Sequence, residues 1–186
     1  AYPVFIMGSW WTILSATWLH GGLLHILFNM MWVRDLGPAS AEIIGPARTV
    51  IIYTISGLCG FLLSSAAGRY LALPIPFFRG ASLTVGASAS IFGLLGALVH
   101  YGRVSGSSVI RGEATRYAVI LFIFGVIFPG VDNYAHAGGF LGGYATSWLF
   151  NPLKRERGDH IIIAAVCLVA TALAVIASLI LGLPGR

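Results

Sequence analysis

The sequence predicts an all-α protein, a polytopic bundle of transmembrane helices in a single domain, and three observations lead to this prediction. Hydrophobic residues make up 58% of the 186 positions and charged residues only 9%, whereas an average soluble domain carries roughly 25% charged residues. The mean hydropathy is +0.89. Several apolar runs approach the roughly 20 residues that a helix needs to cross a hydrocarbon core of about 30 Å. A soluble core of this size would not need such runs.

The apolar runs, taken in order, predict about six spanning helices. Residues 1–19 contain three tryptophans and a proline, so we expect this segment to lie in the membrane interface. The expected spans cover residues 22–33 (extendable to 36), 49–67, 86–100, 117–128, 134–150 and 161–183. Arg34-Asp35 and Gly37-Pro38 are expected to close the first span. Residues 68–80 and 102–116 are expected to be loops, because both are rich in helix-breaking or polar residues.

Lysines and arginines are unequally distributed between alternate loops, and this predicts the orientation. Eight lie on one side, namely Arg34, Arg48, Arg103, Arg111, Arg116, Lys154, Arg155 and Arg157. The other side holds Arg69, Arg79 and Arg186. The richer side should be cytoplasmic, so Ser88 enters the membrane from the outer face. Topology therefore explains the net charge of +5 without nucleic acid as a partner. The two cysteines lie inside apolar runs, which argues against a disulfide framework.

A few polar side chains interrupt the apolar runs, and such groups inside a membrane indicate a functional site by default. His25 and Asn29 are four residues apart and share one helix face. Ser88 and His136 lie near the outer ends of their own spans, so all four side chains are expected at a similar depth. Any one of them could instead satisfy an ordinary interhelical hydrogen bond. His100 and His160 are expected to be solvated and receive no function.

Two stripes of small residues predict that the helices carrying Ser88 and His136 pack backbone to backbone. One stripe consists of Ala89, Gly93 and Ala97, and the other of Ala135, Gly139, Gly143 and Ser147. Alone, such stripes are a common packing device. Beside a serine and a histidine they would bring the two side chains within hydrogen-bond distance.

This arrangement predicts a Ser88–His136 dyad, because a serine hydroxyl needs a base to become nucleophilic. His25, Asn29 and the backbone N–H of Ser88 would donate to the oxyanion of the intermediate. Ser90 is the rival nucleophile, but two residues along a helix turn it through about 200°. Asp132 is expected to be solvated, with a minor alternative of orienting the imidazole. Phe92, one turn after Ser88, could pack against the His136 ring.

The motifs at this point resemble those of the rhomboid intramembrane serine proteases. The segment HGGLLHILFN (residues 20–29) is similar to the family's second-helix motif, GASA (86–89) to its GxSG, and AHAGGFLGG (135–143) to its sixth-helix motif. The resemblance implies Ser88 as nucleophile, His136 as base, and His25 and Asn29 as oxyanion donors. It also implies a structural function for His20 and supporting functions for Gly86, Phe92, Gly139 and Gly143.

Three departures from the family pattern stand out. Ala89 occupies a position where the motif usually has glycine, and we expect activity to survive because the residue stays small. Thr12 follows Trp11 where the family often has Trp-Arg, which is expected to loosen the first loop. The family's first helix would precede this segment, and the chain begins too late to include it.

The resemblance implies an endopeptidase that cuts single-pass transmembrane substrates near the outer membrane face, without metal or cofactor. Within one rhomboid-like domain, 1–186, it implies an interfacial loop (1–21), catalytic helices (22–150) and an extra C-terminal transmembrane helix (161–183). The loops 74–80 and 128–133 are expected to cap the site. We expect a multi-pass integral protein of the bacterial inner membrane, with the lipid bilayer as its surroundings, no nucleic acid partner and an oligomeric state that the sequence does not define.

Three other functions compete with this one. A non-proteolytic rhomboid-like protein that binds transmembrane helices would be expected to lack the serine or the histidine. A metalloprotease or metal transporter would use the histidines, but His20 and His25 enclose GGLL without the glutamate of HExxH. A small transporter would show broken helices in paired halves, and the sequence has no internal symmetry.

Overall fold

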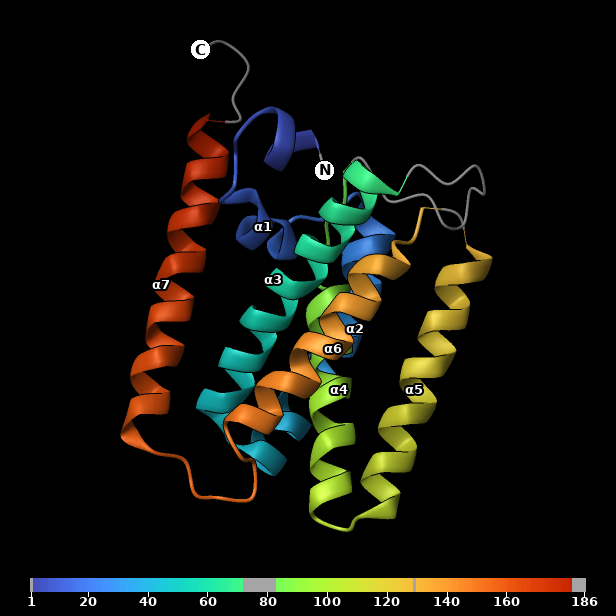
Figure 1. Ribbon diagram of the computed structural model, residues 1–186, viewed down its shortest axis with the longest axis vertical. Helices are drawn as coiled ribbons and strands as arrows, with labels where there is room; N and C mark the ends of the chain where they lie inside the picture. Colours follow the sequence, from blue (N-terminus) through green and yellow to red (C-terminus); the bar gives the residue numbers. More distant parts are fainter. Residues whose placement is uncertain (1, 72–82, 129, 182–186) are drawn as a thin grey trace.

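The computed structural model describes residues 2–71, 83–128 and 130–181 of the chain. The described residues form six long helices, preceded by short helical turns that include α1 (Thr12–Ser15). The long helices are α2 (Leu23–Ile44), α3 (Pro46–Tyr70), α4 (Ser88–Val104), α5 (Ser108–Ile127), α6 (Asn133–Leu149) and α7 (Gly158–Leu181). They run up and down in one bundle (Figure 1). The predicted all-helical bundle is confirmed.

Helix α4 is the centre of the bundle. Twelve of its 17 residues are buried, and it packs against α2, α3, α5 and α6. Its leucines and isoleucine join the largest apolar cluster of the described residues, to which α2, α3 and α5 also contribute. Ser88 is the first residue of this helix. The most buried helix of the bundle therefore carries the candidate nucleophile at its first position.

Glycines allow α6 to approach both α4 and α3 at backbone distance. A Cβ at Gly139 would overlap the backbone of Ala89, and one at Gly143 would overlap the backbone of Gly93. On the other side, a Cβ at Gly60 of α3 would lie 2.6 Å from the carbonyl oxygen of Ala135. The predicted close packing along the small-residue stripes is what the structure contains.

Helix α7 stands at the edge of the bundle, where it contacts α3 and α1 (Figure 1). By length and hydropathy, α3 and α7 are the described helices that could each cross a membrane. Of the expected six spans, the others fall short of this criterion for visible reasons. Helices α4 and α6 have 17 residues each, whereas α2 and α5 are longer but carry charged side chains, α2 in its C-terminal half and α5 in its N-terminal half.

The expected end of the first span, at residues 33–36, is wrong. Helix α2 continues through Arg34, Asp35 and Pro38 to Ile44 and ends at Gly45, whose φ is 96°. Proline removes one helical hydrogen bond, but packing against the rest of the bundle keeps this part of α2 helical. Leu36, Ser40 and Ile44 recur every four residues and are buried. Tertiary packing thus overrides the local break.

The expected polar loop 102–116 is also wrong for most of its length. Helix α5 begins at Ser108, and only residues 105–107 connect it to α4. The Ser107 hydroxyl accepts a hydrogen bond from Ile110 N at 3.3 Å and caps the helix. Ala114 and Ala118 are buried on the same face of α5 and pack in the main apolar cluster. This packing keeps the polar N-terminal part of α5 in the bundle.

The bounds of α3, α4, α6 and α7 lie within a few residues of the predicted spans. The predicted loop 68–80 falls largely outside the described residues, as do the last residues of the 161–183 span. The connection between α4 and α5 and the connection between α6 and α7 both lie at the lower end of Figure 1. Ser88 begins α4 at the opposite end.

Candidate active site

Ser88 is placed by an extended segment, residues 83–87, that runs into the start of α4. Gly86 in this segment has φ 125° and donates its N–H to Ala16 O at 2.9 Å. A side chain at this position would be strained by that φ, and its Cβ would lie 2.7 Å from His25 Nε2. At the start of α4, the first backbone N–H groups have no helical acceptor and form a positive helix end. Ser88 is half-buried there.

His136 lies in the first turn of α6, where its ring meets Ser88. The distance between His136 Nε2 and Ser88 Oγ is 3.0 Å. The ring stacks on Phe92, with centroids 4.2 Å apart and planes 15° from parallel. His136 is only 5% exposed. The hydroxyl and the imidazole from two different helices are therefore in hydrogen-bond contact.

Asn133, which sequence analysis did not single out, contacts the other ring nitrogen. Its Oδ1 lies 3.0 Å from His136 Nδ1, and its Nδ2 donates to Phe122 O at 3.4 Å. Because a carbonyl only accepts, the amide nitrogen faces Phe122 and the amide oxygen faces His136. Nδ1 of His136 must then carry the proton. Nε2 is left as an acceptor for the Ser88 hydroxyl.

His25 has the opposite tautomer. Gly21 N donates to His25 Nδ1 at 3.2 Å. A backbone N–H cannot accept, so Nδ1 is unprotonated and the neutral ring carries its proton on Nε2. That nitrogen faces Gly86, two residues before Ser88. Asn29 is buried one turn later on α2, and its Nδ2 donates to His25 O at 2.8 Å with a second N–H still available.

These groups line one open cavity of about 760 Å³. The cavity walls come from α2, the 83–85 segment, α4, α5 and the start of α6. Its polar residues include Ser88, His136, His25, Asn29 and Asp132. The remaining lining is mainly apolar and includes Leu24, Phe28 and Trp32 of α2 and Phe124 of α5. The rings of Phe28 and Phe124 stack across the α2–α5 gap, with centroids 5.6 Å apart.

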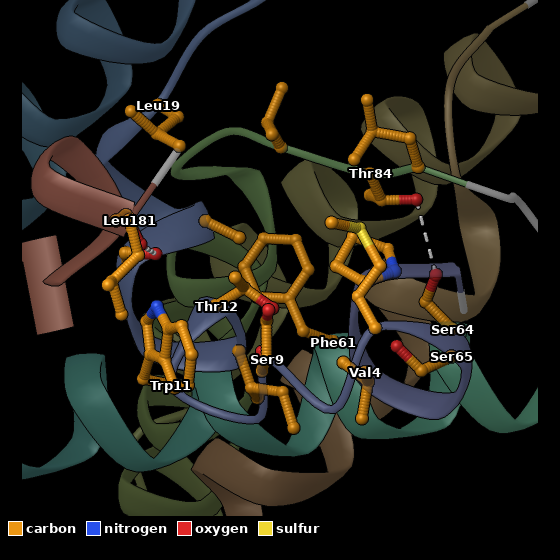
Figure 2. A pocket seen from close by; sticks show the side chains of 18 residues that line it. Val4, Ser9, Trp11, Thr12, Leu19, Phe61, Ser64, Ser65, Thr84 and Leu181 are labelled. Atoms are coloured by element: carbon orange, nitrogen blue, oxygen red, sulfur yellow. Dashed lines mark hydrogen bonds between the residues drawn. The ribbon is translucent and has the colours of Figure 1, made fainter. Parts of the chain in front are cut away.

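A second, smaller cavity of about 260 Å³ lies on the other side of the 83–85 segment. Figure 2 shows its lining side chains, which come from the N-terminal segment, α1, α3 and the end of α7. Leu83, Thr84 and Val85 line both cavities. The segment that leads to Ser88 is therefore a wall between two hollows.

Ser90 and His20 lie apart from the dyad. Ser90 is fully buried and donates to Tyr53 O of α3 at 2.7 Å. His20 packs edge-on against His25, with ring centroids 5.1 Å apart. Burial, followed by the nearby His25, lowers the pKa of His20. His20 therefore contacts a ring of the candidate site without lining the cavity itself. In the described parts of the chain, no group of three or more His, Cys, Asp or Glu side chains could hold a metal ion.

Three expectations about titratable residues are wrong. His100 is 4% exposed and its Nδ1 lies 2.9 Å from Ser147 Oγ, between α4 and α6. His160 is 7% exposed and packs edge-on against Phe150. Asp132 caps α6 rather than facing solvent, since its Oδ1 accepts from the first backbone N–H groups of that helix. Contacts between helices therefore extend to the helix ends, where the sequence predicts that polar side chains are solvated.

The arrangement is suited to acyl transfer. A hydroxyl faces an unprotonated imidazole nitrogen, and donors from α2 and from the start of α4 converge beside it. The expected site residues Ser88, His136, His25 and Asn29 all line the same cavity. Gly86 and Phe92 contact His25 and His136 directly, whereas Gly139 and Gly143 act one step away by setting the α4–α6 distance.

Comparisons with known proteins identify the family of this sequence. A family model described as "Rhomboid domain" matches residues 7–153. RHOMBOID-like protein 7 of Arabidopsis thaliana is 34% identical over 144 residues, 75% of this chain and 42% of the relative. RHOMBOID-like protein 2 of the same plant is 35% identical over 144 residues, with the same coverage of 75% and 42%. Rhomboid protease GluP of Bacillus subtilis is 30% identical over 168 residues, 89% of this chain and 31% of the relative. The chain thus spans less than half the length of these relatives.

Proposed function

The chain belongs to the rhomboid family, and on that premise we propose that it is an intramembrane serine endopeptidase. The family is integral to membranes and includes bacterial rhomboid proteases. The observation that supports the activity of this chain is the 3.0 Å contact between Ser88 Oγ and His136 Nε2. Its support is strengthened by Asn133, which directs the unprotonated nitrogen of His136 toward the hydroxyl.

In the first step, Ser88 Oγ attacks the carbonyl carbon of the scissile peptide bond while its proton passes to His136 Nε2. The imidazolium that forms keeps its Nδ1–H on Asn133. The negative charge moves to the carbonyl oxygen, where the Ser88 N–H, His25 Nε2–H and Asn29 Nδ2–H act as donors. Collapse of this intermediate breaks the C–N bond, and the leaving amine takes the proton from His136.

The second half of the reaction repeats the same proton path with water. The acyl group is bound to Ser88 as an ester, and His136 is neutral again. A water molecule gives its proton to Nε2 as it attacks the ester carbonyl. Release of the acid product returns that proton to Ser88 Oγ. Phe92 holds the plane of the ring in both halves, because the two rings stack.

Substrate chemistry follows from the cavity. Its apolar lining on α2 and α5 suits a helix that arrives from lipid, so the proposed substrates are single-pass transmembrane proteins cut near the outer face. The proposal assigns catalysis to residues 22–150, makes α7 an additional helix, and places the protein in a bacterial inner membrane. Phe128, Gly130 and Val131 line the cavity from the 128–133 connection, one of the two expected caps. The other, 74–80, lies outside the described residues.

A reconstituted cleavage assay tests this proposal. The chain and a tagged single-pass reporter are mixed in liposomes, and products are identified by mass spectrometry. We expect cleavage within the outer part of the reporter helix by the parent protein and by Ser90→Ala. Ser88→Ala and His136→Ala should each yield no product. Cleavage by Ser88→Ala at the parent rate would overturn the mechanism.

The alternative is a non-proteolytic rhomboid-like protein that binds transmembrane helices. The same assay separates it, because co-purification of an intact reporter with the parent protein, without any product, supports binding alone. The presence of both Ser88 and His136 in contact favours the peptidase.

A further inference from the structure

The carboxylate of Asp132 binds more groups than a helix cap needs. Its Oδ1 accepts from Tyr134 N at 3.0 Å and from Ala135 N at 3.1 Å, which caps α6. Its Oδ2 accepts from Thr84 Oγ1 at 2.6 Å and also from Ser64 Oγ. A capping aspartate requires only the first pair. The second pair joins α6 to two other parts of the chain.

The two hydroxyls come from two different parts of the chain. Ser64 belongs to α3, and Thr84 lies four residues before Ser88 in the segment that leads into α4. Figure 2 shows Thr84 and Ser64 facing each other, with their hydroxyl oxygens 3.2 Å apart. Thr84 and Asp132 both line the candidate active-site cavity. The hydrogen-bonded group Ser64–Thr84–Asp132 therefore lies where the two cavities meet.

The same carboxylate is also one turn from His136. The backbone N–H of His136 donates to Asp132 O at 3.2 Å, so Asp132 and His136 belong to the same first turn of α6. At the other end of the contact, Thr84 donates to Asp132 and lies four residues before Ser88, whose hydroxyl contacts the His136 ring. One side chain thus connects the segment of the nucleophile with the helix of the base.

We propose that Asp132 is a positioning residue, which fixes the Ser88 segment against the start of α6 through Thr84 and Ser64. This inference rests on the proposed function, because the distance it fixes is the one between Ser88 and His136. Segment 83–87 has no regular secondary structure. Besides the backbone hydrogen bond from Gly86 N to Ala16 O, its position depends on side-chain contacts such as those of Thr84. Misplacing a reacting group by about 1 Å can lower a rate on the order of a hundredfold.

The test compares two substitutions of Thr84, one that keeps its shape and one that keeps its hydroxyl. Thr84→Val removes the hydroxyl and keeps the volume, whereas Thr84→Ser keeps the hydroxyl. Thr49→Val, at the cytoplasmic end of α3, is the matched control, since its hydroxyl donates to Gly45 O far from this group. Asp132→Asn adds an independent variant that can still cap α6 but presents an amide to the two hydroxyls. Reporter cleavage is measured per folded protein, with kcat and KM determined separately.

We expect Thr84→Val and Asp132→Asn to lower kcat on the order of tenfold or more, with KM within about twofold. Thr84→Ser and Thr49→Val should stay close to the parent. Equal losses in Thr84→Val and Thr84→Ser, or a parent-like kcat in both Thr84→Val and Asp132→Asn, would overturn the inference.

A second measurement does not depend on proteolysis. The nitrogen-15 chemical shift of His136 Nε2 reports whether that nitrogen accepts a hydrogen bond. Thr84→Val should move it toward the value of a free acceptor nitrogen, as Ser88→Ala does. If Thr84→Val shows this shift change while the parent protein cleaves no reporter, the proposed function is contradicted and the positioning by Asp132 is supported. An unchanged shift in Thr84→Val would contradict the positioning even if the parent is an active protease.

Discussion

At the scale of single residues, the proposed mechanism gives different functions to two histidines with opposite tautomers. Gly21 N donates to Nδ1 of His25, so its proton lies on Nε2 and the ring is a donor. Asn133 accepts from Nδ1 of His136, so its Nε2 is an acceptor. The same side chain can therefore stabilise an oxyanion at one place and remove a proton at another. The difference comes from one hydrogen bond at each ring.

Asn133→Ala should slow catalysis without changing substrate binding. The substitution leaves Nδ1 of His136 without its acceptor, so the ring can place its proton on the nitrogen that must act as base. Losing a hydrogen bond of a buried group costs about 1–3 kcal/mol, which corresponds to roughly fivefold to 150-fold in kcat. Asn133→Asp, which keeps an acceptor oxygen, should retain more activity than Asn133→Ala. Kinetics on the liposome reporter measure both, and a kcat of Asn133→Ala within twofold of the parent contradicts this function of Asn133.

His25→Ala should lower kcat by a much larger factor than the factor by which it changes KM. Its Nε2–H is proposed to stabilise charge that exists only in the tetrahedral intermediate, and one such donor contributes about 2.7–4 kcal/mol. The expected loss is on the order of a hundredfold to a thousandfold in kcat. If the substitution mainly raises KM, His25 binds the substrate in its ground state and is not an oxyanion donor.

Sequence patterns indicate part of this site and miss part for a physical reason. Ser88, His136, His25 and Asn29 stand out because polar groups are rare in apolar runs. Asn133 lies at a helix start, where an asparagine usually interacts with solvent or the backbone. Its spacing of three residues before His136 was the available signal, since such residues share a helix face.

At the scale of secondary-structure elements, the site depends on how closely α6 approaches α4. Because the glycines of α6 have no side chains, the backbones of α6 and α4 are in contact, and the serine of α4 reaches the histidine ring of α6. Small-residue spacing in the sequence predicts this crossing. It does not predict where helices end, because burial of Leu36 and Ile44 extends α2 past Pro38.

Gly139→Ala and Gly112→Ala form a matched pair that tests this packing. A Cβ at Gly139 would overlap the Ala89 backbone, whereas one at Gly112 of α5 meets nothing within 4 Å. Overpacking typically costs about 1–3 kcal/mol, so Gly139→Ala should lower the unfolding midpoint in detergent. Gly112→Ala should leave it unchanged or raise it, because alanine is the better helix former by roughly 1 kcal/mol. Equal midpoints for the two variants would show that the α4–α6 contact is looser than described.

At the scale of the whole molecule, the end opposite Ser88 is fixed by a buried arginine. Arg48 is 4% exposed and donates to Asn151 O at 2.8 Å and Lys154 O at 2.6 Å. Glu156 accepts from the backbone N–H of Arg48 at 2.6 Å. This group ties the start of α3 to the connection between α6 and α7. Stability at this end and chemistry at the other are therefore separable.

Arg48→Met should destabilise the protein without changing the chemistry of the folded fraction. It leaves the carbonyls of Asn151 and Lys154 without their donor and removes the ion pair between the Arg48 guanidinium and Glu156, although the backbone N–H still donates to Glu156. Breaking a buried ion pair costs about 3–5 kcal/mol. The unfolding midpoint in detergent should fall clearly, while kcat per folded protein stays near the parent value. A parent-like midpoint contradicts the structural function of Arg48, and a normal midpoint with lost activity would place Arg48 in the catalytic path.

Composition is sufficient to predict the all-helical bundle, and it predicts less about how each helix meets the membrane. Helices α4 and α6 have 17 residues, which is at the short end of the range of about 17–25 residues for a membrane crossing. The buried positions of His100 and His160 follow from contacts between helices that are distant in sequence. Such contacts leave no local pattern to detect.

The most direct test of the central claim is the site of covalent labelling by a fluorophosphonate probe, determined by mass spectrometry of the detergent-solubilised protein. A hydroxyl activated by His136 should be phosphonylated at Ser88. The label should disappear in Ser88→Ala and His136→Ala and remain in Ser90→Ala. Label on another serine, or label that persists in Ser88→Ala, would contradict the assignment of Ser88 and His136 as the reacting pair.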